Sequence, residues 1–167
     1  MKKFYILIFV FCFFSKLFAL EMYGNFDQGN LIRGKASINS KIFIDDKKIK
    51  VSPEGFFAFG ISKDRKNDIS IKVVKDGVTK KIIKKVYKKK YKIQRIDGLP
   101  KKQVTPPKEV YERIKADNRI ISKARMVDTN LIFFNEDFIF PLNNSIITGV
   151  YGSQRILNGI PKSPHYG

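Results

Sequence analysis

Cysteine, histidine and tryptophan are almost missing from this chain of 167 residues. It has one cysteine, Cys12, one histidine, His165, and no tryptophan. An internal disulfide is excluded because it needs two cysteines. Cys12 lies within an apolar run and has no small-residue pattern before it, so it is a poor site for lipid attachment. The folded part must therefore be held together by an apolar core, which 15 phenylalanines make feasible, or by a metal.

A long hydrophobic run is also lacking. The longest, Phe4–Phe14, has eleven residues, whereas about 20 are needed to span a bilayer. Lys2 and Lys3 precede it and Ala19 offers a cleavage point, which predicts a secretory signal peptide over residues 1–19. We therefore expect an exported protein of the periplasm or cell envelope. The alternative is an uncleaved N-terminal membrane anchor that extends to Leu20.

Acidic residues are scarce: 15 stand against 33 lysines and arginines, for a net charge of +18. Three lysines fall in the predicted signal peptide, which leaves +15 on the exported part. Such a charge attracts polyanions. In an envelope these are anionic lipid surfaces, acidic glycans and the carboxylates of peptidoglycan, and export argues against nucleic acid. The alternative is a solvated surface whose many lysines reflect an AT-rich genome and have no binding role.

Residues 21–96 carry the pattern of a small β-sandwich. Ile42–Ile44 and Ile49–Val51 flank the polar residues 45–48, which predicts a hairpin. The stretch DISIKVV alternates and places three apolar residues on one face. Turns are predicted at Ser52–Gly55 and at Lys75–Gly77. About six short strands between regular turn signals are typical of a sandwich.

A very basic stretch ends this region. Between Lys72 and Lys102 there are thirteen lysines and arginines, two acids, and the interleaved Tyr87 and Tyr91. Aromatic rings among lysines can stack on sugar or base faces while the charges follow a polyanion. The other interpretation is an edge strand with Tyr87, Tyr91 and Ile93 on one face and lysines on the solvated face.

Residues 97–129 read as a proline-rich linker followed by a helix. Thr105 is predicted to cap the helix, Pro106 suits its first turn, and the helix should reach about Arg125. Val110, Ile114, Ile121 and Ala124 would form one packed face. From residue 130 the pattern returns to strands, and the 38 residues that remain are too few to bury a core of their own.

The final segment, Phe138–Gly167, resembles the opening of the lysostaphin-type (LytM) zinc endopeptidase domain of bacterial cell-wall hydrolases. The family begins with an aromatic–proline pair, continues with a G-x-(I/V)-(T/S)-(S/G)-x-(F/Y)-G-x-R stretch, and reaches an H-x-G-x-D motif. The matching residues are Phe140, Pro141, Ile147, Thr148, Gly149, Tyr151, Gly152, Arg155, Pro164, His165 and Gly167, with Asn144 where the family often has glycine. Upstream, QGNLIRG, IDGLP, VTPP and ISKAR look like one subgroup of these exported peptidases.

The residue patterns predict a mostly β protein with a β-sandwich over 21–96 and a Pro-rich linker with a helix over 97–129. The resemblance adds that 130–167 are the first strands of a peptidase domain. It implies that His165 is the first zinc ligand. The aspartate of the motif would fall two residues after Gly167, and the family's later H-x-H would complete the site. The chain is then the N-terminal part of an exported zinc endopeptidase that cuts peptide cross-links of peptidoglycan, inactive by itself because its metal site is incomplete.

The sequence leaves two points open. By the resemblance, Arg155 lies in the loop that leads to His165, where it would line the groove for wall peptide or serve the local fold. Asn158 and Gly159 favour a turn with positive φ. The alternative function is that of a non-catalytic envelope protein that binds peptidoglycan or regulates other wall hydrolases.

Overall fold

The computed structural model describes residues 19–166, so the predicted signal peptide lies outside it except for its last residue. The chain is mostly β, as predicted. It forms two compact units, one from residues up to Lys89 together with Ile132–Ile139, the other from Lys90–Leu131 together with residues from Phe140 onward. Within residues 19–166, none of the helices has the length and apolar character needed to cross a bilayer.

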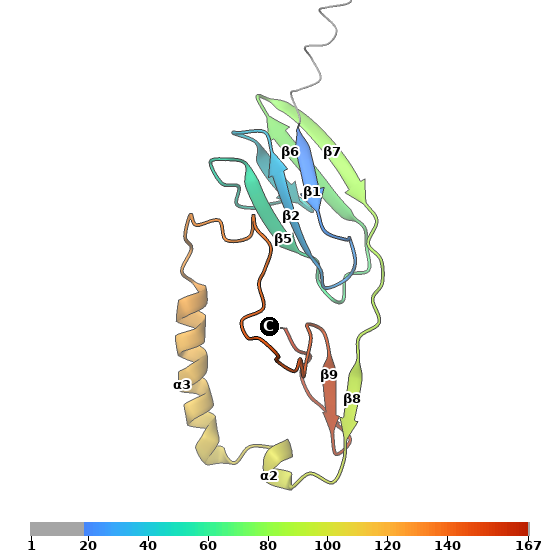
Figure 1. The fold of residues 1–167 in the computed structure, drawn as a ribbon, viewed down its shortest axis with the longest axis vertical. Helices are drawn as coiled ribbons and strands as arrows, with labels where there is room; N and C mark the ends of the chain where they lie inside the picture. Colours follow the sequence, from blue (N-terminus) through green and yellow to red (C-terminus); the bar gives the residue numbers. More distant parts are fainter. Residues whose placement is uncertain (1–18, 167) are drawn as a thin grey trace, which may run out of the picture. The chain divides into compact units, whose positions relative to one another are not determined.

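The first unit contains two antiparallel sheets (Figure 1). One has the order β1-β2-β5 and the other the order β4-β3-β6-β7. Their bounds are β1 Leu20–Tyr23, β2 Leu31–Ala36, β3 Lys41–Ile44, β4 Lys47–Lys48, β5 Phe56–Gly60, β6 Ile69–Lys75 and β7 Val78–Lys84. Short turns or loops join β1 to β2, β3 to β4 and β6 to β7, as antiparallel pairing allows. β5 pairs with β2, and β6 with β3, across longer connections that contain strands of the other sheet.

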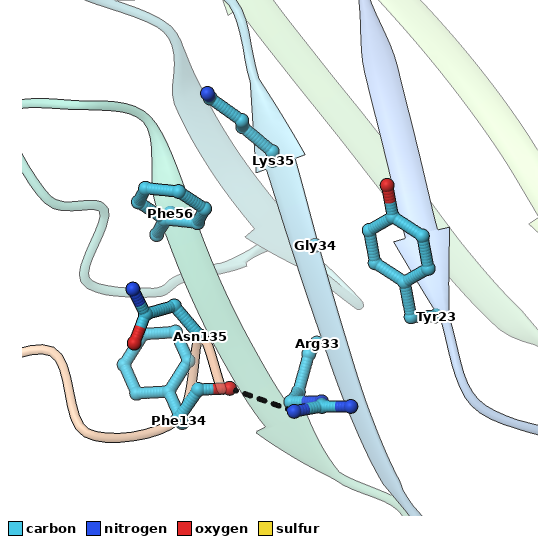
Figure 2. A pocket seen from close by; sticks show the side chains of 7 residues that line it. All are labelled: Tyr23, Arg33, Gly34, Lys35, Phe56, Phe134 and Asn135. Atoms are coloured by element: carbon cyan, nitrogen blue, oxygen red, sulfur yellow. Dashed lines mark hydrogen bonds between the residues drawn. The ribbon is translucent and has the colours of Figure 1, made fainter. Parts of the chain in front are cut away.

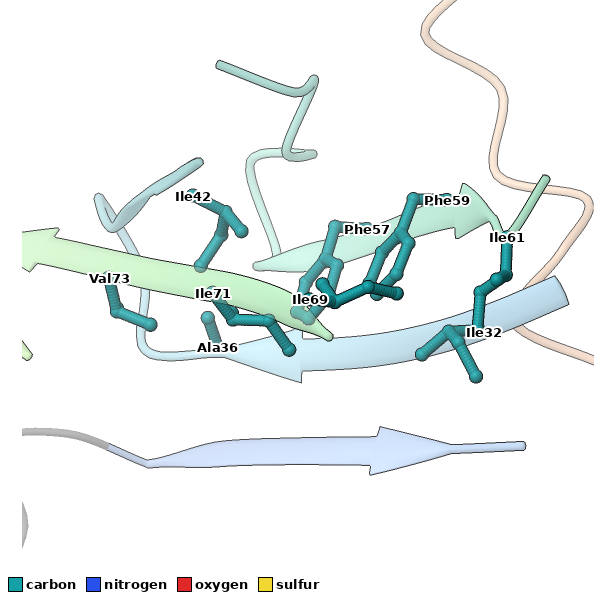
Figure 3. Packing of buried hydrophobic residues seen from close by; sticks show 9 residues of the cluster. All are labelled: Ile32, Ala36, Ile42, Phe57, Phe59, Ile61, Ile69, Ile71 and Val73. Carbon is teal, nitrogen blue, oxygen red and sulfur yellow. The ribbon is translucent and has the colours of Figure 1, made fainter. Parts of the chain in front are cut away.

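Apolar side chains from both sheets meet in one core (Figure 3). The predicted alternation of β6 is confirmed, because Ile69, Ile71 and Val73 are all buried. Phe57 of β5 and Ile32 of β2 are fully buried from the other sheet. Two sheets that share a core in this way form the predicted sandwich.

Tight turns set the register of the second sheet. Asp45 and Asp46 both have positive φ and make a two-residue hairpin, tighter than the predicted four-residue turn but of the kind that twisted strands prefer. Asp76 and Gly77 turn the chain between β6 and β7 in the same way. The side-chain hydrogen bond from Arg65 holds the pKa of the Asp45 carboxyl below its usual value.

The basic stretch after β7 is not the continuous edge strand that was predicted. β7 is an edge of its sheet, but it ends at Lys84, and the next residues contribute only one bridge, between Asp27 and Tyr87. The main chain of Tyr87 is bonded to the loop after β1 instead, and the Gln28 side chain accepts a hydrogen bond from the Lys89 amide. These long-range bonds replace the sheet ladder that strand continuation would need.

The second unit contains a small sheet and two helices. β8 (Ile93–Ile96) is parallel to β9 (Gln154–Leu157), which is antiparallel to β10 (Ile160–Pro161). The connection from β8 to β9 carries α2 (Lys101–Val104) and α3 (Lys108–Arg125). β8, which the sequence pattern assigned to the first region, therefore pairs with the C-terminal segment.

The helix predictions are partly wrong. α3 ends at Arg125 as expected, but the residue before its first turn is Pro107, not Thr105. Thr105 is instead the C-cap of α2, where its amide donates a hydrogen bond to the Lys101 carbonyl. The predicted packed face is not found: no residue of α3 is buried. A second proline after Thr105 explains the shift, because proline fixes an extended entry to the helix.

The strands predicted just after residue 130 are also absent, since residues 130–153 form no strand. Arg33 of β2 donates hydrogen bonds to the main-chain carbonyls of Phe134 and Glu136. These carbonyls would otherwise accept the hydrogen bonds of a neighbouring strand. Pro141 lacks an amide hydrogen, and Asn144 has φ 57°, a turn conformation.

The core predicts a large difference between two isoleucines. We expect Ile71→Ala to lower the free energy of unfolding by about 2–5 kcal/mol, because Ile71 is 0 % exposed and the truncation leaves a cavity. Ile83→Ala on β7 is the matched control: its side chain is 57 % exposed, so the loss should stay below about 1 kcal/mol. Urea denaturation measures both, and equal losses would contradict the sandwich core.

Candidate functional site

The C-terminal hairpin is built around Asn158 and Gly159. Both have positive φ, 47° and 78°, and they connect β9 to β10, so the turn predicted for this pair is confirmed. The Asn158 side chain also bonds a distant loop: its amide donates to the Leu99 carbonyl at 2.7 Å, and its oxygen accepts from the Leu99 amide at 3.0 Å. Asn158 thus has a structural role that ties the IDGLP segment to the hairpin.

The main chain of His165 holds it beside residues Tyr151–Arg155, the YGSQR stretch. The Gly152 amide donates to the His165 carbonyl at 2.7 Å, and the His165 amide donates to the Ser153 carbonyl at 2.8 Å. The imidazole is exposed and lies against Gly149, where an added Cβ would stand 3.1 Å from its Cδ2 atom. The two sequence motifs that surround Gly149 and His165 are therefore adjacent in space.

Gly152 is required by its surroundings. Its φ is 82°, and a Cβ placed there would lie 2.2 Å from the ring of Tyr91. Both the backbone conformation and the close approach exclude any larger residue. The sequence pattern predicted a strand face or a stacking platform for Tyr91 and so missed this packing role. A glycine at position 152 is a sequence signal for close packing, but it does not identify Tyr91 as the neighbour.

Two further features complete the local geometry. The rings of Tyr151 and Tyr166 meet edge to face with centroids 6.2 Å apart, which adds a side-chain contact between the residue after His165 and the residue before Gly152. Lys162 extends its amine to the carbonyl of the buried Val104, and its own carbonyl accepts a hydrogen bond from the Gln154 side chain at 2.8 Å. These two bonds hold Lys162, and with it the segment that leads to His165.

The expected loop position of Arg155 is wrong: Arg155 lies within strand β9, exposed and in register with Gln94 of β8. Its main-chain carbonyl accepts a hydrogen bond from the Lys162 amide at 2.9 Å, so the backbone at this position serves the hairpin. The role of its guanidinium in a groove stays a prediction.

The described residues do not fit a complete zinc site. A catalytic zinc needs about three protein ligands, and residues 19–166 bring no group of three histidine, cysteine, aspartate or glutamate side chains together. His165 supplies a single imidazole. What this part of the chain offers is one positioned donor next to a glycine-rich turn.

No protein-family model matches the chain, and no curated protein matches it either.

The packing of Tyr91 gives a prediction with a matched control. Gly152 and Gly159 have similar positive φ, but only Gly152 has a neighbour within 4 Å of an added Cβ. We expect Gly152→Ala to speed hydrogen exchange of the His165 amide at least about tenfold, because the segment that accepts its bond must move. Gly159→Ala should cost only the strain of positive φ, about 1–2 kcal/mol, and leave that amide protected. Equal exchange in both variants would count against the contact.

Proposed function

We propose that this chain is the N-terminal part of an exported zinc-dependent endopeptidase that hydrolyses peptide cross-links of peptidoglycan. One observation carries the proposal: the His165 main chain is hydrogen-bonded to Gly152 and Ser153. The residues that resemble the lysostaphin-type family fall in two separate stretches of sequence. Their adjacency in space is what a shared metal and substrate site requires.

Backbone conformation gives further support. Asn144 stands where the family often has glycine, and its φ of 57° is one that glycine adopts most readily and asparagine tolerates. Gly152 occupies a glycine position of the motif and admits no side chain. The backbone geometry at these two positions therefore restricts which residues fit, beyond the identity of the residues with the family motif.

His165 alone does not make the chain an enzyme. A single exposed imidazole holds zinc weakly compared with a set of three ligands, so the 167 residues by themselves are expected to be inactive. In this proposal the remaining ligands come from residues after Gly167. The described part contributes the first ligand, the hairpin that positions it, and Arg155 as a candidate side chain of the substrate groove.

The missing ligands should be encoded downstream of the last codon. We expect that reading frame to give an aspartate two residues after Gly167 and an H-x-H sequence later. The longer protein should release peptides from cross-linked peptidoglycan. A chelator should abolish this activity, and His165→Ala should reduce it at least about a hundredfold, because a ligand is lost.

Tyr166→Phe of the longer protein is the control, since it leaves the ring contact with Tyr151 possible and removes no expected ligand. Mass spectrometry of the released muropeptides measures the rate. A stop codon with no such residues in any frame, or full activity of His165→Ala, would refute the proposal.

A second candidate is a non-catalytic envelope protein that binds peptidoglycan. It is favoured by the first unit, which has its own core and exposes lysines along the edge strand β7. We expect the purified chain to sediment with isolated peptidoglycan at physiological salt, where charges are screened beyond about 8 Å. A chain that stays in the supernatant under these conditions does not have this function.

A further inference from the structure

A pocket of about 260 Å³ lies on the first unit, on the outer face of the β1-β2-β5 sheet (Figure 2). Strand register explains its lining. Tyr23 of β1 is paired with Arg33 of β2, and Lys35 of β2 is paired with Phe56 of β5. Because side chains alternate along a strand, these residues point away from the core that Ile32 and Phe57 fill.

The segment Ile132–Ile139 forms the remaining wall, and Arg33 holds it there. The guanidinium donates to the carbonyl of Phe134 at 3.3 Å, to the carbonyl of Glu136, and to the carboxylate of Asp137 at 3.1 Å. Phe134 and Asn135 line the pocket as a result. The charge of Arg33 is largely taken up by this segment, so Arg33 shapes the pocket.

Lys35 is the pocket residue whose positive charge can pair with an anionic ligand. Its amine lies 4.9 Å from the centre of the Phe56 ring, and within residues 19–166 it forms no ion pair. Glu21 stands opposite Lys35 in the ladder, yet it accepts a hydrogen bond from the Tyr23 hydroxyl at 2.7 Å and does not line the pocket. That bond raises the pKa of the Tyr23 phenol, so the hydroxyl stays protonated and donates to Glu21.

Three aromatic rings, the backbone of Gly34 and one side-chain amide make up the rest of the lining. Tyr23 is 55 % exposed, while Phe56 and Phe134 are half-buried. Ring faces carry partial negative charge, which suits the C–H groups of a sugar ring. The Asn135 amide offers one acceptor and two donors that match hydroxyl or acetamido groups.

We propose that this pocket binds a sugar residue that carries a carboxylate. The carboxylate would pair with Lys35, the sugar ring would lie on the Tyr23 and Phe134 rings, and Asn135 would bond its polar substituents. A ligand above β2 would be held by side chains and not by strand addition, because β2 is hydrogen-bonded to β1 on one side and to β5 on the other. The inference stands without the proposed hydrolysis.

Titration of the full chain with four probes tests the proposal by amide NMR. Two carboxylated sugars are used. N-acetylmuramic acid represents wall glycan that has lost its stem peptide, which leaves the carboxylate free, and glucuronic acid represents another acidic polysaccharide. N-acetylglucosamine is the neutral counterpart, and D-lactate supplies a carboxylate without a ring. We expect saturable shifts at residues 33–35, 134 and 135 with at least one carboxylated sugar, and binding of N-acetylglucosamine and D-lactate at least about tenfold weaker.

Variants with matched controls decide which groups are responsible. Lys35→Met keeps most of the aliphatic chain and should weaken binding of the carboxylated sugar about tenfold, whereas Lys41→Met, an exposed lysine of the other sheet, should not. Tyr23→Ala should also weaken binding, but Tyr87→Ala should leave it unchanged although Tyr87 is equally exposed, at 57 %.

Unfolding curves show that each variant is folded before it is titrated. The proposal is overturned if all four probes bind alike, if D-lactate binds as well as the carboxylated sugars, if no saturable shift occurs at the pocket, or if Lys35→Met and Lys41→Met behave alike.

Discussion

The contact between the Tyr91 ring and Gly152 is the constraint on which the C-terminal site depends. Because Gly152 has no side chain, the Tyr91 ring can pack against the place that a Cβ would occupy. The turn there has a positive φ that other residues avoid. The amide of Gly152 then reaches the His165 carbonyl, and the Ser153 carbonyl receives the His165 amide. His165 is thus positioned through its backbone, and the residue is exposed.

The first unit is organised differently. Alternating apolar residues on two sheets make an ordinary core, and one arginine then adds a segment from far along the chain. Arg33 donates hydrogen bonds to residues about a hundred positions away. These bonds place the segment Ile132–Ile139 over the outer face of the sheet, where it forms one wall of the pocket. A strongly basic chain could bind anions unselectively through its lysines; a pocket with rings, an amide and one available amine can select among them.

Local patterns predicted the local structure well. The alternation of Ile69, Ile71 and Val73 and the turns at residues 76–77 and 158–159 all rest on neighbours in sequence, and the structure confirms them. Features that depend on distant partners could not be predicted. The parallel pairing of β8 with β9, the Arg33 bonds and the packing of Tyr91 on Gly152 leave no periodic signal in the chain. The helix start was misjudged because Pro107 competes with the cap that Thr105 would offer.

We propose that His165 is a zinc-ligand position presented by a turn that the described residues already form. The most direct measurement is anomalous X-ray scattering at the zinc edge from crystals of the protein extended past Gly167. We expect a zinc peak about 2.0–2.1 Å from a ring nitrogen of His165, the usual zinc–histidine distance. A zinc ion bound elsewhere, with the His165 imidazole pointing into solvent, would contradict it.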